Sequence, residues 1–158
     1  MKEKNFIPKF VSIVVIALGC IDIVRGFMHT IMLEHAALNI AGFDLSTSLA
    51  GDLLQQMGAF GISNYLTGIM LILIGWKARP LALVMLSVIP VAYTIGVIGI
   101  KINSASYAPS QAEWGGTQPM IVYLSICVIS FITGHIMTQI QKGKNLSAEA
   151  HHNQRKPK

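Results

Sequence analysis

Four long apolar stretches constrain this chain more than any other feature of its sequence. A helix needs roughly 20 apolar residues to cross a hydrocarbon core about 30 Å thick, and four stretches of the 158-residue chain meet this requirement with few charges. They run from about residue 10 to 33, 57 to 76, 81 to 102 and 119 to 140. The sequence therefore predicts an all-α integral membrane protein, with four transmembrane helices within residues 1–142 and a basic, flexible cytoplasmic tail over residues 143–158.

The composition excludes a water-soluble globular domain. Hydrophobic residues make up 53% of the chain and charged residues only 12%, whereas a soluble domain carries about 25% charged residues and needs them to cover its surface. A β-barrel is excluded as well, because barrel strands alternate apolar and polar residues over about ten positions. The four stretches are continuously apolar, so helices remain as the way to satisfy the backbone in lipid.

The positions of the basic residues predict the orientation of the chain. Cytoplasmic loops of membrane proteins retain an excess of lysine and arginine. Ten of the twelve basic residues flank the predicted helices on one side: Lys2, Lys4, Lys9, Lys77, Arg79, Lys142, Lys144, Arg155, Lys156 and Lys158. The loops on the other side contain only Lys101, together with four acidic residues. We therefore expect both termini to face the cytoplasm from a plasma or inner cell membrane. The +5 net charge then encodes orientation and is not a surface for binding a partner. The expected surroundings are the lipid bilayer, and no nucleic acid is expected to bind.

Small residues recur every seven positions in the first two predicted helices. They are Ser12, Gly19 and Gly26 in the first helix, and Gly61, Gly68 and Gly75 in the second. Helices associate in lipid through close packing, so such residues mark contact faces, and this spacing fits the shallow crossing of helix bundles. The sequence predicts an antiparallel four-helix bundle, with the third helix bent at Pro90.

The predicted outer loop between the first two spans carries a second helical pattern. Leucines and a methionine recur at helical spacing from Leu45 to Met57, and Ser46 or Ser48 is placed to cap a helix. We expect a short interfacial helix at this position.

Three polar residues share one stripe of the first predicted helix. Asp22, Arg25 and His29 are spaced i, i+3 and i+7, which places them within about 60° of arc on a helix. A charge at the membrane centre costs at least about 2.5–3.5 kcal/mol on insertion scales. The stripe is therefore expected to point into the bundle.

The other predicted helices carry polar residues at similar depths, at a rise of about 1.5 Å per residue. These are Asn64 and Tyr65 in the second helix, Tyr93 in the third and Tyr123 in the fourth. Two interpretations stay open. Asp22 and Arg25 neutralise each other as a structural pair, or all seven residues line a pocket for a lipophilic small molecule or a proton path, open toward the outer face.

Histidines and acidic residues favour neither a metal nor a haem site. His29 lies near the outer end of its helix and His135 near the cytoplasmic end, a height difference of about 20 Å, so the two cannot ligate one haem iron; haem on one histidine is disfavoured. A further group gathers on the outer side: His29, Glu34, His35, Asp52 and Glu113. Their spacing matches no ligand set, so we expect solvated side chains and no metal.

The middle of the chain combines a glycine-bearing helix, the turn Gly75-Trp76-Lys77-Ala78-Arg79 and an apolar helix, in the sequence GISNYLTGIMLILIGWKARPLALVMLSVIPVAYTIGV. Together with four spans and an arginine in the first helix, this pattern resembles the DoxX-like family of small four-helix membrane proteins over about two-thirds of the chain. Asn64-Tyr65 stands where members often carry an acidic residue. Members are associated with membrane redox systems, as subunits near quinone or sulfur chemistry. The resemblance implies redox partner proteins, with quinone as the ligand to consider.

Three functional hypotheses follow. The first is an accessory subunit or binding protein whose pocket takes a quinone-like molecule in a membrane redox system. The second is a small proton-coupled transporter in which Asp22 gains and loses a proton and Arg25 adjusts the pKa of Asp22. Four helices suffice for transport only in a homodimer. The third is a membrane enzyme with His29 as general base, although the sequence contains no supporting catalytic motif and assigns no catalytic residue.

Overall fold

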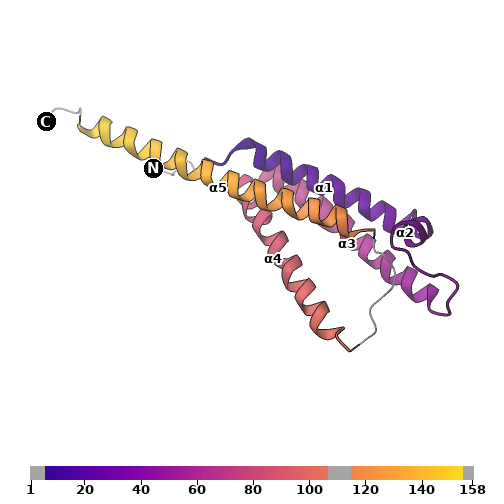
Figure 1. Cartoon of the computed structure of the whole chain (residues 1–158). Coiled ribbons are helices and arrows are strands. Elements are labelled where there is room, and N and C mark those ends of the chain that lie inside the picture. The colour runs from indigo at the N-terminus through magenta and orange to yellow at the C-terminus, as the bar shows by residue number, and fades with distance from the viewer. Residues whose placement is uncertain (1–5, 107–114, 155–158) are drawn as a thin grey trace.

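The computed structural model describes residues 6–106 and 115–154, with side chains to residue 148. Within these ranges the chain is helical and contains no strand. The helices are α1 (Lys9–Thr30), α2 (Leu33–Asn39), α3 (Ala50–Lys77), α4 (Arg79–Asn103) and α5 (Thr117–Gln154) (Figure 1). All except α2 are long and apolar enough to cross a membrane. The four predicted spans are thus confirmed, and the protein is a multi-pass, all-α membrane protein.

Helices α1 and α3 form the closest contact in the fold, and small residues make it. Three pairs face each other: Gly19 with Gly68, Gly26 with Gly61 and Ser12 with Gly75. A Cβ atom added to Gly19 would lie 2.6 Å from the carbonyl oxygen of Gly68, so the two backbones touch. Because residue numbers rise along α1 as they fall along α3, the two helices run in opposite directions. The predicted contact faces are confirmed.

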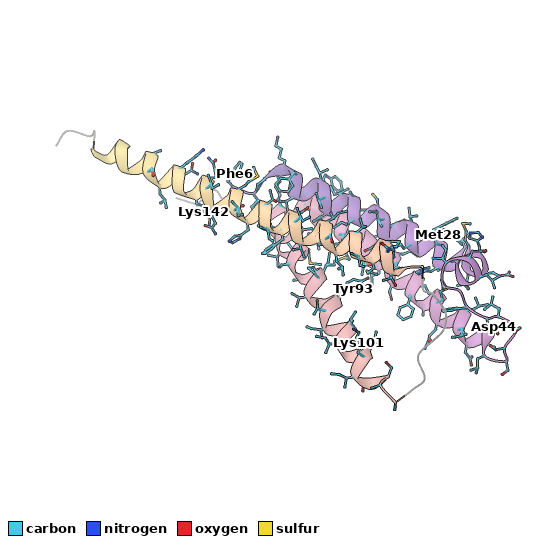
Figure 2. The ribbon with its side chains drawn as sticks, viewed as in Figure 1. Phe6, Met28, Asp44, Tyr93, Lys101 and Lys142 are labelled. Atoms are coloured by element: carbon cyan, nitrogen blue, oxygen red, sulfur yellow. The ribbon has the colours of Figure 1, made fainter. Side chains whose placement is uncertain are left out.

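Helix α4 joins the packing of the other helices only with its first half. Ala82, Leu83 and Leu86 are buried in the main apolar core, which also contains residues of α1, α3 and α5. Beyond Pro90, α4 diverges from the other helices, and Lys101 lies at its far end (Figures 1 and 2). Lipid tails are as apolar as leucine, so no hydrophobic force draws this half of α4 onto its neighbours. The sequence predicted close packing of all four helices. For α4, this prediction holds only in the first half of the helix.

The segment between α1 and α3 differs from the sequence-based prediction. The short helix is α2, at Leu33–Asn39, and residues 50–56 form the first turns of α3. Ser46 caps no helix, because its hydroxyl and backbone N–H both donate to Asp44 Oδ1, at 2.6 and 2.9 Å. These bonds, the hydroxyl first, lower the pKa of Asp44 below its usual value. The predicted helical pattern around Leu45–Met57 is thus helical from Ala50 onward, but as the first turns of α3 and not as a separate interfacial helix. Before residue 50, this local turn competes with helix formation.

Helix α5 extends well beyond the other helices. It continues to Gln154, so residues 143–154 of the predicted tail are helical, and residues 155–158 lie outside the described part. Alanine, glutamine, lysine and glutamate in this segment favour a helix. Phe6 and Lys142 lie at one end of the molecule, whereas Met28 and Asp44 lie at the other (Figure 2).

Candidate functional site

Asp22 is a buried carboxylate with a partner on each oxygen. The residue is 6% exposed. Arg25 donates from Nη1 to Oδ1 at 3.4 Å, and Tyr123 of α5 donates its hydroxyl to Oδ2 at 3.2 Å. The pairing with Arg25 follows from their i, i+3 spacing on one helix face. These hydrogen bonds hold the carboxylate in place, and the one from Tyr123 ties α1 to α5.

Arg25 keeps most of its hydrogen-bonding capacity unused. A guanidinium has five N–H donors, yet within the described part of the chain its only protein partner is Asp22. The side chain is 30% exposed and lines two cavities. The remaining donors are therefore available to a group in those cavities.

His29 and Asn64 meet across the contact between α1 and α3. Asn64 Nδ2 lies 3.3 Å from His29 Nδ1. When the amide donates in this pair, the hydrogen of a neutral imidazole resides on Nε2. His29 is then a second donor next to Arg25.

Two cavities meet at Arg25 and His29. One, of about 590 Å³, extends between α3 and α4 and is called here the α3–α4 lobe. The other, of about 610 Å³, extends between α1 and α5 and is called the α1–α5 lobe. Both are bordered by Arg25, His29, Ala41, Met57 and Met120. Each lobe has the size of a typical ligand pocket, with apolar walls and few polar groups.

Six of the seven predicted site residues come together here. Arg25, His29, Asn64 and Tyr93 line the α3–α4 lobe, and Tyr123 lines the α1–α5 lobe. Asp22 holds Arg25 by the ion pair.

Tyr65 is the exception among the seven. Its hydroxyl lies 3.0 Å from Thr30 Oγ1, and its ring packs where a Cβ atom of Gly26 would be. It lines neither lobe. Tyr65 therefore packs in the α1–α3 contact. The sequence predicted it in the pocket lining, and the structure places it elsewhere.

The structure adds residues that the sequence did not point to. Met57, Met120 and Phe43 line one or both lobes, but apolar residues carry no chemical signature that separates a pocket wall from a core. Gln56 also lines the α3–α4 lobe. The sequence placed Gln56 in an expected interfacial helix of the outer loop, just before the predicted second span, and not on the helix that forms this span.

Residues 33–43, named here the α2 cap, close both lobes at one end. Ala36, Ala37 and Ala41 are buried against Met57 in a small apolar core of their own. The carbonyl oxygen of Ile40 accepts a hydrogen bond from the backbone N–H of Gly115 at 3.0 Å. A Cβ atom on Gly115 would lie 2.7 Å from that oxygen, so only glycine permits this contact between the cap and the start of α5.

Among the residues that the structure describes, no three histidine, cysteine, aspartate or glutamate side chains gather to hold a metal ion. Glu113, one of the predicted outer group, lies outside these residues.

Comparison of the chain with protein-family models, with curated proteins and with solved structures returned no match.

Proposed function

We propose that the protein binds a lipophilic small molecule with a hydrogen-bond-accepting head, such as a quinone, at Arg25 and His29. The observation that carries the proposal is the junction of two apolar lobes at a guanidinium that has one protein partner among the residues that the structure describes. Lysine and arginine positions support an orientation with both termini in the cytoplasm of a cell membrane. The site then lies in the outer half of the bilayer.

The polar groups of the site suit a ligand whose head is uncharged and accepts hydrogen bonds. Arg25 supplies only donors, and His29 supplies a donor from Nε2. Tyr93 lines the same lobe and adds a hydroxyl. The charge of Arg25 is already balanced by Asp22, so an anionic head would leave an excess negative charge in a low-dielectric site. A quinone carbonyl accepts hydrogen bonds without adding charge.

The protein acts in this proposal as an accessory subunit or binding protein of a membrane redox system. The resemblance of residues 60–101 to DoxX-like proteins supports this part. Partner proteins then exchange electrons with the bound molecule, and this chain positions its head.

Replacing Arg25 with glutamine is expected to weaken quinone binding by tenfold or more. A hydrogen bond from a charged donor is worth about 1.5–3 kcal/mol, and about 1.4 kcal/mol corresponds to a factor of ten in affinity. The measurement is a calorimetric titration of a short-tailed quinone into the protein in lipid nanodiscs.

Arg79→Gln is the matched control. Arg79 is an exposed arginine at the start of α4, outside both lobes, and its replacement is expected to leave the affinity unchanged. Equal affinities of the wild type and Arg25→Gln would make the ion pair with Asp22 purely structural. A wild type that binds no quinone would refute the proposed ligand class.

A further inference from the structure

The wall of the α3–α4 lobe is open toward the surrounding lipid. Phe60 of α3 and Ile100 of α4 line this lobe, yet they are 64% and 68% exposed. One face of α4 carries residues at spacing i, i+3 and i+7, namely Tyr93, Gly96 and Ile100. A Cβ atom on Gly96 would meet nothing within 4 Å. The divergence of α4 from α3 (Figure 1) therefore leaves a gap that no side chain at Gly96 fills.

Hydrogen bonds tie the helices together on two other sides of the site. At one end, the α2 cap packs against Met57 and is tied to the start of α5 through Ile40 and Gly115. Between α1 and α5, the buried side chain of Tyr123 donates its hydroxyl to Asp22. In the described ranges of the chain, no hydrogen bond or ion pair joins α3 to α4 in the corresponding way. The α3–α4 gap is thus a side of the site that can widen without breaking such a tie.

We propose that the ligand reaches the site from within the bilayer, through the gap between α3 and α4. This inference rests on the proposed function. The head moves first to Arg25 and His29, and the apolar tail stays between Phe60 and Ile100, where it remains in contact with lipid. The ligand class is thereby narrowed to amphiphiles dissolved in the membrane, with an acceptor head and a tail that contributes to binding.

The test obstructs the gap with a tryptophan and adds the same bulk elsewhere as a control. Gly96→Trp places an indole in the gap, and Ile100→Trp does so from the next turn of the same face. Ile129→Trp enlarges an exposed residue of α5 that lines neither lobe. Gly51→Trp adds the same bulk at the start of α3, where nothing lies within 4 Å. Circular dichroism verifies that each variant is folded.

The measurement is time-resolved photolabelling in proteoliposomes, with a photoreactive quinone that bears a long isoprenoid tail. The labelled fraction is followed against the contact time before the flash. We expect Gly96→Trp and Ile100→Trp to slow labelling at least tenfold, and Ile129→Trp and Gly51→Trp to label at the wild-type rate. Unchanged labelling in both gap variants, or slowing in Ile129→Trp or Gly51→Trp equal to theirs, would overturn this path. A wild type that is not labelled would instead refute the proposed function.

Discussion

Leucine in place of Gly19 is expected to disrupt the contact between α1 and α3 and to destabilise the fold. The new Cβ atom would lie 2.6 Å from the carbonyl oxygen of Gly68 and 2.9 Å from the side chain of Ile72. Overpacking a core costs about 1–3 kcal/mol and occasionally more. Here the obstructing atom belongs to backbone, so the helices must separate. SDS-induced unfolding in mixed micelles measures the loss.

Gly96→Leu is the matched control for this prediction. It introduces the same side chain into another transmembrane helix, at a position where a Cβ atom meets nothing within 4 Å. We expect unchanged or slightly raised stability, because leucine favours a helix more than glycine does. Equal destabilisation by both substitutions would show that the cost comes from losing glycine itself and not from the α1–α3 contact.

Alanine at Asp22 is expected to give the second large effect. It leaves the Arg25 guanidinium without its counter-charge and the hydroxyl of Tyr123 without its acceptor. Removing one partner of a buried ion pair costs about 3–5 kcal/mol, and the 30% exposure of Arg25 places the expected loss at the lower end of that range. The same unfolding assay measures it.

Two further variants separate charge from packing in this prediction. Tyr123→Phe removes one hydrogen bond to the carboxylate and should cost about 1.5–3 kcal/mol. The double variant Asp22→Leu, Arg25→Leu should recover most of the loss seen in Asp22→Ala, because no charge then stays unpaired. A double variant as unstable as Asp22→Ala would contradict the assignment of the loss to an unpaired charge.

The sequence predicted those parts of the fold that depend on local spacing. Hydropathy gave the four spans. The heptad spacing of small residues predicted the two faces that meet in the α1–α3 contact, and the structure pairs Gly19 with Gly68 there. The i, i+3 spacing of Asp22 and Arg25 gave the ion pair.

Other parts depend on contacts that no local pattern records. Pro90 predicted a bend in this helix, but nothing in the sequence indicates that α4 diverges from its neighbours beyond it, since its residues are as apolar as those of a packed helix. The sequence placed Tyr65 in the pocket only because of its depth in the membrane. Depth does not distinguish a pocket wall from a helix contact. In the structure, the hydroxyl of Tyr65 lies next to that of Thr30. The lobes themselves result from the positions of Met57 and Met120 on separate helices, which the sequence does not bring together.

Native mass spectrometry of the protein released gently from its own membrane can detect the proposed ligand itself. We expect a retained small molecule of the quinone class, at one per chain, on the wild type and on Arg79→Gln, with strongly reduced occupancy on Arg25→Gln. A folded wild type that retains no such molecule, or an Arg25→Gln variant that retains it at wild-type occupancy, would contradict quinone binding at Arg25.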